Sequence, residues 1–281
     1  YAGVALAQFD GTPTSPQRFG SHPEAAQWDV QVHSRDFNTW LQLQTMQAQH
    51  GPDCSGPPAT HPISAYEDAV FVCNNHVMTA LKADGYGVIY LTPNRTVNCS
   101  ASCEVRFDVS TERMSTRDWI DVALTPWGDN LALPLLSDLS QGVDLQGWPR
   151  NYVHFSNDNL EGDWHVATVV NDVKNDYYPR SGALGAGIDG SVNQAATRQT
   201  FRISIEGSRL RLERLESLTA GARVYFDQVV PLPADRSAML FQLGHHSYTP
   251  EKDNAGRPGT WHWDNVEMTP SQAFTLIKAQ E

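Results

Sequence analysis

The sequence is poor in basic residues and has no long apolar run. Its 281 residues include 20 Lys and Arg against 32 Asp and Glu, which gives a formal net charge of −12. Nucleic acid is an unfavourable partner for such a chain, because phosphates require a basic surface. No apolar stretch approaches the roughly 20 residues that a membrane-spanning helix needs. The sequence therefore argues against nucleic-acid binding and against a membrane span.

Amphipathic helices, internal repeats and low-complexity tracts are also missing. Short alternating runs follow one another instead, separated by Gly, Pro, Asn and Asp. The runs expected to form strands lie at 29–33, 37–50, 69–73, 77–81, 87–91, 105–109, 119–124, 152–155, 164–170, 200–205, 209–215, 224–229, 239–243 and 260–268. This pattern predicts an all-β protein, a sandwich or a barrel.

The composition fits one globular domain. Hydrophobic residues make up 40% of the chain and charged residues only 19%, which argues against disorder. We expect an N-terminal arm over 1–28, a single β-sandwich domain over 29–270 and a C-terminal tail over 271–281. Residues 181–197, rich in Gly, Ala and Ser, are expected to form a flexible loop able to cover a groove.

The clearest hairpin lies at 201–213. Phe201, Ile203 and Ile205 alternate with polar residues, and a Gly-Ser turn precedes a second alternating run. One face of this hairpin is therefore expected to lie in the core and the other in water.

Four cysteines bear on the compartment of the protein. We favour the disulfides Cys54–Cys73 and Cys99–Cys103, because each closes a local loop. Free buried thiols are the next alternative, and a zinc site lacks the usual Cys-x-x-Cys spacing.

The first residues lack the basic segment and apolar core of a signal peptide, so the chain either starts after processing or is not exported. The cysteines favour export, to the extracellular space. The sequons at Asn94 and Asn98 add little, since roughly two are expected by chance in such a sequence.

The stretch Thr260–Met268 carries the most distinctive side chains. As a regular strand it places Trp261, Trp263 and Asn265 on one face. The other face then carries His262, Asp264, Val266 and Met268. Because that second face includes Val266 and Met268, it is expected to face the core. The two tryptophans are then expected to be exposed, as flat platforms for a sugar ring.

The hairpin Thr200–Leu212 and the closing strand Trp261-His-Trp-Asp-Asn-Val266 together resemble the concanavalin A-like lectin/glucanase group. With 117–121, 144–147 and 244–248 they also resemble secreted, uncharacterised bacterial proteins. The resemblance covers about residues 30–268 and implies a two-sheet jelly roll with carbohydrate as the usual ligand. The β-glucanase branch uses Glu-x-Asp-x-x-Glu, of which Glu161 and Asp163 match, but Val166 replaces the last Glu.

Glycoside hydrolysis needs two carboxylates about 5–9 Å apart. The candidates are Asp118 and Asp121 around Trp119, and Glu161 with Asp163. Asp118 and Asp121 fall on opposite faces of a strand, which favours structural salt bridges instead.

Calcium is the cofactor that the acids favour. Asp264 stands where jelly-roll sugar-binding modules commonly tie in the N-terminal segment, and Glu251 and Asp253 are alternative ligands. The competing interpretation is that Asp264 accepts hydrogen bonds. A transition-metal site of His245 or His246 with His262 and Asp264 is a weaker alternative, since adjacent histidines point oppositely in a strand.

Aromatic side chains give the firmest functional indication. Besides Trp261 and Trp263, the candidate ligand contacts are Trp127, Trp148 and Tyr152, with Asn265 for hydroxyl recognition. Core tryptophans are the alternative interpretation for at least half of the set.

The sequence thus predicts an exported lectin-like β-sandwich that binds carbohydrate or a glycan surface. The alternatives are a polysaccharide hydrolase or lyase, and a self-assembling extracellular structural subunit. They differ in whether product is released and whether large assemblies form without sugar.

Overall fold

β-Strands dominate the chain. The computed structural model describes residues 4–7, 17–18, 27–34, 69–73, 76–81, 87–113, 118–129, 149–158, 164–177, 198–217, 221–247 and 259–273. In these ranges eighteen strands form two nine-stranded sheets, and every pairing is antiparallel. The predicted all-β sandwich is confirmed. No helix within these ranges is both long and apolar enough to cross a bilayer.

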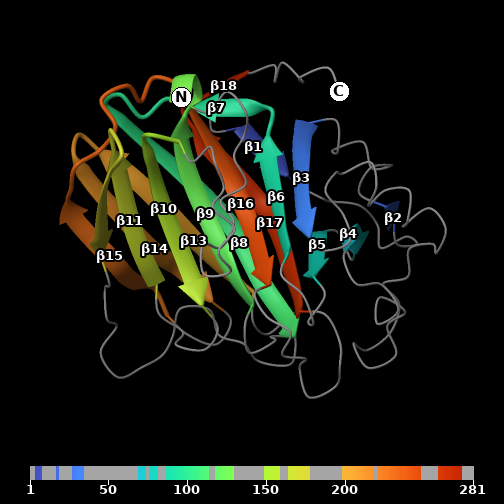
Figure 1. Ribbon diagram of the computed structural model, residues 1–281. Coiled ribbons are helices and arrows are strands. Elements are labelled where there is room, and N and C mark those ends of the chain that lie inside the picture. The colour runs from blue at the N-terminus through green and yellow to red at the C-terminus, as the bar shows by residue number, and fades with distance from the viewer. Residues whose placement is uncertain are drawn as a thin grey trace.

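The first sheet lies behind the second in Figure 1. Its order is β15 (Arg223–Val229), β14 (Arg209–Ser217), β13 (Gln199–Glu206), β8 (Ser102–Arg113), β17 (Gly259–Thr269), β5 (His76–Leu81), β4 (Ala69–Cys73) and β2 (Gln17–Arg18), with β1 (Val4–Ala7) on β17.

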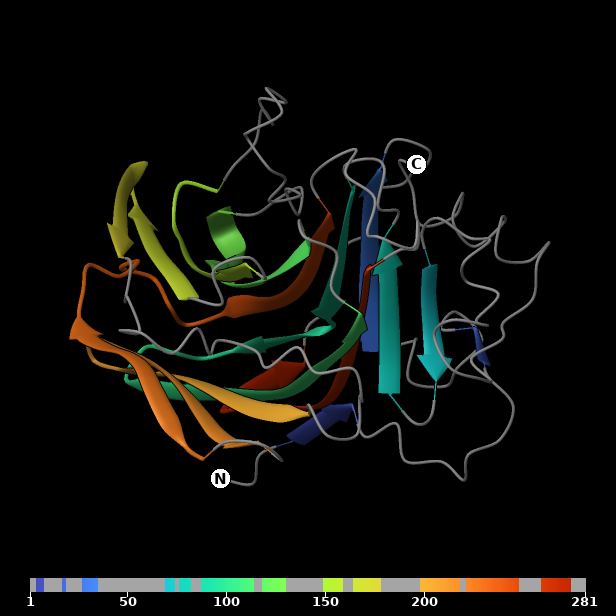
Figure 2. The ribbon, with the colours of Figure 1, turned by 90° about the horizontal axis from the view of Figure 1, so that it is seen from below.

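The second sheet runs in the order β12 (Val173–Tyr177), β11 (Trp164–Val170), β10 (Tyr152–Asp158), β9 (Asp118–Pro126), β16 (Met239–Ser247), β6 (Gly87–Pro93) and β3 (Trp28–Ser34). At one end β7 (Arg95–Val97) pairs with β16, and β18 (Ser271–Ala273) pairs with β7. Figure 2 shows that both sheets curve, and that the second sheet turns its concave side away from the first. We call that side the concave face.

The core fills the space between the sheets, because apolar side chains that point inward alternate along the strands with side chains that point outward. In the β13–β14 hairpin Phe201, Ile203 and Ile205 are buried, as their spacing predicts, while Glu206 is exposed. Gly207 lies in the turn with φ 59°, a left-handed conformation that glycine adopts without a steric penalty.

Most strands match runs that were expected from the sequence. The expected arm contributes β1 and β2 to the first sheet, and the expected tail contributes β18 to the second. The run 37–50 and the loop 181–197 lie outside the described residues, so they remain predictions, as do the domain boundaries.

The Cys99–Cys103 disulfide is confirmed. Cys54 lies outside the described residues, so its pairing with Cys73 stays a prediction.

The closing strand β17 corrects the sequence analysis. Trp261 and Trp263 are 0% and 2% exposed and belong to the same core as Val266 and Met268. The register against β8 shifts between Asp264 and Glu267, which is a β-bulge. An extra residue changes the parity of a strand, so residues on both sides of the bulge point into the core. The prediction of exposed Trp261 and Trp263 is therefore wrong.

Asn265 holds the bulge. Its φ is 47°, in the left-handed region, and its side-chain amide donates to Asp108 Oδ2 at 2.8 Å. Asn is among the residues that adopt this conformation most readily. Asn265 is thus a structural residue, not the exposed sugar contact that its sequence position suggested.

We expect Asn265→Ala to lower the free energy of unfolding by about 2 kcal/mol, because it loses the hydrogen bond and because Ala tolerates the left-handed region less well than Asn does. Asn265→Gly loses the hydrogen bond alone, so its cost should be about 1 kcal/mol smaller. Urea unfolding of both variants measures the difference. Equal losses would show that the backbone conformation contributes nothing.

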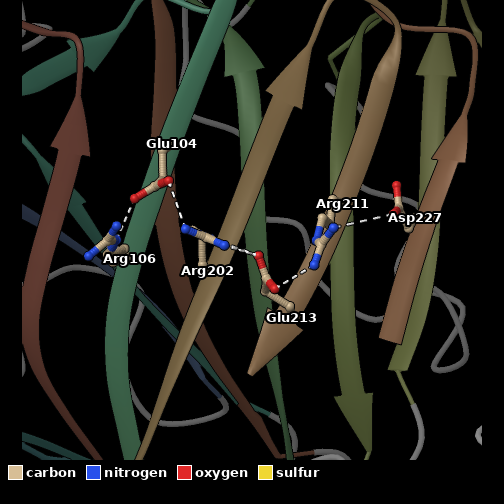
Figure 3. Close-up of polar contacts among 6 residues, drawn as sticks. All are labelled: Glu104, Arg106, Arg202, Arg211, Glu213 and Asp227. Atoms are coloured by element: carbon tan, nitrogen blue, oxygen red, sulfur yellow. Dashed lines mark hydrogen bonds and ion pairs between the residues drawn. The ribbon is translucent and has the colours of Figure 1, made fainter. Parts of the chain in front are cut away.

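A chain of ion pairs crosses the convex outer face of the first sheet (Figure 3). Arg202 on β13 lies at its centre and reaches Glu104 on β8 at 3.3 Å and Glu213 on β14, while Arg211 continues from Glu213 to β15. The full chain consists of Arg106, Glu104, Arg202, Glu213, Arg211 and Asp227. Its charges alternate, and the pairs Arg202–Glu104, Arg202–Glu213 and Arg211–Asp227 each join two neighbouring strands.

Substitution of Arg202 by Met should lower the free energy of unfolding by about 1 kcal/mol, because the half-buried guanidinium joins three strands. High salt should reduce the loss. Arg209→Met is the matched control, since Arg209 pairs with Asp227 at a largely exposed position and should matter little. If the two variants lost the same free energy of unfolding, the central position of Arg202 would add nothing to stability.

Candidate functional site

Polar side chains gather on the concave face because side chains alternate along each strand. Where one residue points into the core, its neighbours point to the concave face. Ile120, Val122 and Leu124 of β9 point into the core, so Asp121 and Ala123 point to the concave face. The same alternation brings residues of β6, β16, β10, β11 and β12 to that face.

These residues form a line across the sheet that we call the His–Asp row. From β6 to β12 it consists of Tyr90, His246, Asp121, His154, His165, Asp176 and Lys174.

Asp121 is the centre of the row. Its Oδ1 accepts a hydrogen bond from His154 Nε2 at 2.7 Å, and its Oδ2 pairs with His246 Nε2. The Tyr90 hydroxyl lies 2.9 Å from His246 Nε2 and 3.4 Å from Asp121 Oδ2. Because a carboxylate only accepts, both imidazoles carry their proton on Nε2 when they are neutral.

A second carboxylate repeats this arrangement toward the sheet edge. Asp176 Oδ1 lies 2.9 Å from both His165 Nε2 and Lys174 Nζ. His165 Nδ1 lies 3.5 Å from Ser156 Oγ, and its ring meets the His154 ring edge-on with centroids 6.5 Å apart. Two imidazoles therefore lie side by side, each tethered by a carboxylate on its outer side.

Small residues make room for these rings. Ala123 and Ala167 flank His154 on the two neighbouring strands, and Ser156 lies between Asp121 and His165. The hydrogen bonds therefore run diagonally, over distances that long side chains can bridge. Gly244 serves Tyr90 in the same way, because a Cβ at Gly244 would overlap the Tyr90 ring.

Exposure rises steadily along the row. Tyr90 is fully buried and the side chain of Asp121 is 3% exposed, whereas His154 is 15% and His165 23% exposed. The Lys174 side chain at the far end is 52% exposed. The row is thus closed at β6 and open at β12, and His154 and His165 lie in its half-open middle.

Electrostatics keep Asp121 ionised. Burial alone would raise the pKa of this carboxyl, but His246 and His154 hold it well below its usual range. Burial and Asp121 raise the pKa of Tyr90 well above 10, so its hydroxyl stays protonated. Burial lowers the pKa of His165, with a further contribution from His154, and Asp176 opposes both.

Replacing Asp121 by Asn should lower the free energy of unfolding at neutral pH by about 3 kcal/mol, because two enclosed imidazoles lose their anion. Because the pKa of Asp121 is depressed in the fold, its ionised carboxylate stabilises the protein above the unfolded-state pKa of about 4. This contribution is lost as the pH falls. Urea unfolding over a pH series should therefore show a shallower acid loss in Asp121→Asn. Asp172→Asn, at a largely exposed position, should follow the wild type. Parallel pH curves for all three proteins would contradict the role of Asp121.

The predicted aromatic contacts have separate positions. Tyr152 is buried beside His154, with ring centroids 6.5 Å apart, and therefore adjoins the row. Trp127 is partly exposed, in the 3₁₀ turn η4 (Trp127–Asp129) that follows β9. Trp148 lies outside the described residues.

The predicted catalytic acids are only partly described. Asp121 lies in the row, but its carboxylate is enclosed by basic partners and ionised. It is therefore unsuited to act as the general acid of a hydrolase. Glu161 and Asp163 lie outside the described residues, as does the side chain of Asp118.

Of the three predicted calcium ligands, only Asp264 lies in the described part of the chain. Asp264 accepts a hydrogen bond from the backbone N–H of Asn265 and lies 4.0 Å from Arg198, which also binds Asp108. This is the hydrogen-bonded alternative for Asp264. No group of three or more His, Cys, Asp or Glu among the described residues is arranged to hold a metal. Glu251 and Asp253 lie outside those ranges, so calcium stays a prediction.

The histidines of the transition-metal alternative are separated. His245 points into the core, where its Nδ1 lies 3.1 Å from Thr79 Oγ1, and His246 points to the concave face. His262 alternates with two core tryptophans on β17 and so faces the other side of the first sheet.

The sequons flank β7, with Asn94 in the bend before it and Asn98 between β7 and the disulfide loop. Asn94 donates its backbone N–H to Gln27, and the Asn98 side chain accepts from the N–H of Ser100. Glycosylation of either residue stays a prediction.

The sequence analysis missed most of the row, namely Tyr90, His154, His165, Asp176 and the partnership of His246 with Asp121. The available signal was parity: Tyr152, His154 and Ser156 alternate with Val153 and Phe155. Parity assigns a face, but the order of strands in the sheet decides which residues meet.

Comparisons with known proteins identify the fold. No protein-family model matches the chain, and no curated protein matches it. The LamAcat structure from Zobellia galactanivorans is 8% identical, with 92% of this chain and 97% of that chain covered and a TM-score of 0.51. A β-1,3-glucanase from Mycobacterium marinum is 13% identical, with coverage of 95% and 100% and a TM-score of 0.49. Lectin I-B4 from Griffonia simplicifolia is 12% identical, with coverage of 73% and 92% and a TM-score of 0.42.

The similarity to LamAcat and the order of strands in the two sheets indicate the same fold. The chain has the concanavalin A-like jelly-roll fold that its motifs suggested.

Proposed function

We propose that this protein binds carbohydrate on the concave face of its second sheet, over the His–Asp row. The fold supports this, since carbohydrate is the usual ligand of the group that the motifs resemble. The observation that carries the proposal is Asp121, a buried carboxylate held between His154 and His246 on that face.

The chemistry of the row suits sugar hydroxyls, which both donate and accept hydrogen bonds. Imidazole, hydroxyl, carboxylate and ammonium groups supply both functions within one line. Asp121 and Asp176 fix the two half-open imidazoles before any ligand arrives, so little side-chain entropy is lost on binding. This row replaces the tryptophan platform that the sequence suggested.

Export is part of the proposal. The Cys99–Cys103 disulfide supports it, because disulfides persist in oxidising compartments. Calcium is retained as a variable to be tested, on account of Glu251 and Asp253.

A polysaccharide-acting enzyme is the second candidate, favoured by the Asp121–His154 pair. An ionised carboxylate on Nε2 orients the imidazole, which leaves Nδ1 to accept a proton. Because Asp121 is unsuited to be a general acid, this arrangement favours proton abstraction by a lyase over two-carboxylate hydrolysis.

A glycan array with the purified protein tests the proposal, run with calcium and with a chelator. Replacing His154 by Gln removes the tethered imidazole and should weaken binding about tenfold or more. Arg209→Gln on the convex face is the control and should bind like the wild type. Assays for new reducing ends and for unsaturated product test the second candidate with the same glycans.

Two results would sink the proposal. One is a folded protein that binds no glycan on the array. The other is glycan binding that His154→Gln and His165→Gln both leave unchanged.

A further inference from the structure

Basic groups outnumber carboxylates along the His–Asp row, although the chain as a whole is acidic. The row contains four basic side chains, His246, His154, His165 and Lys174, against the carboxylates of Asp121 and Asp176. Both carboxylates already bond to basic partners. Among the described residues of the row, the open end therefore offers N–H donors, in a protein of net charge −12.

The two half-open imidazoles form the centre of this basic segment. His154 and His165 lie on adjacent strands with ring centroids 6.5 Å apart. Each is tethered through Nε2 to a carboxylate on its far side, Asp121 on β9 or Asp176 on β12. When protonated, both rings carry positive charge toward the same place, and Lys174 stands next to them on β12.

We infer that the ligand of the concave face is an anionic glycan, one that bears carboxylate or sulfate groups, and that His154 and His165 bind one such group together. This inference rests on the proposed function. An anion beside both rings offsets the repulsion between two imidazolium ions, which a neutral sugar does not do.

The arrangement makes binding depend on pH. The groups that face His154 are Asp121, His165 and Tyr152, with His246 on the other oxygen of Asp121. Those that face His165 are His154, Ser156, Asp176 and Lys174. Burial and the neighbouring His154 lower the pKa of His165 in the free protein, and a bound anion opposes both effects. Binding therefore takes up protons, and affinity rises as the pH falls toward the free-state pKa.

Calorimetric titration with a matched pair of ligands tests the inference: a uronic-acid oligosaccharide and the same oligosaccharide with its carboxyl groups reduced. A sulfated oligosaccharide of equal length shows whether sulfate replaces carboxylate. We expect the acidic form to bind about tenfold more tightly than the neutral form at about pH 5.5, with most of this preference lost by about pH 7.5.

Variants assign the effect to named groups. His165→Gln, at a part-exposed position, should remove most of the pH dependence, and His154→Gln should do the same with a larger loss of affinity. Lys174→Gln should weaken acidic ligands at both pH values and keep a pH dependence, because both histidines remain. Arg209→Gln removes a positive charge from the convex face and should change nothing.

Equal affinity for the acidic and reduced ligands overturns the inference, and so does a preference that neither histidine variant alters. If the reduced ligand binds and requires His154, carbohydrate binding stands while the anionic preference fails. If no ligand binds the folded protein at either pH, both proposals fail.

Discussion

A buried carboxylate must be neutralised where it lies, and the concave face is organised around this requirement at Asp121. Leaving a carboxylate of 3% exposure without a partner would cost several kcal/mol. Two imidazoles from neighbouring strands meet the requirement, one at each carboxylate oxygen, and a tyrosine hydroxyl lies 3.4 Å from Oδ2. Each of these partners needs space, which Ala123 and Gly244 leave free. The small side chains at these two positions, on β9 and β16, thus follow from one charge.

The bulge in β17 is a second constraint, and it decides which surface is available for function. Without it, either the two tryptophans or the pair Val266 and Met268 would leave the core. With it, both sets are buried, and β17 exchanges its neighbour β5 for β1 at that point. The tryptophans therefore build the sandwich. The recognition that we propose therefore falls to polar groups on the other sheet.

The sequence was sufficient for the fold because alternation is local. Phe201, Ile203 and Ile205 predict one strand with a buried face and a solvent-facing face. A series of such strands predicts a sandwich. Trp261 and Trp263 were misjudged because a single inserted residue inverts parity, and nothing before Asn265 marks the insertion. The row was missed for a different reason: Asp121 and His246 are 125 positions apart in the printed sequence, and only the strand order makes them neighbours. Local patterns carry no information about that order.

The open end of the row lies on the strand with the weakest attachment. Among the described strands β12 bonds to β11 alone, at the end of the second sheet, and Val173 at its start is 63% exposed. A strand held along one side frays at a lower free energy than a strand held along two. Fraying of β12 removes Asp176 and releases the His165 ring, while Asp121, His154 and the core stay in place. The face therefore has one half held between neighbouring strands on both sides, and one half whose order depends on the attachment of a single edge strand.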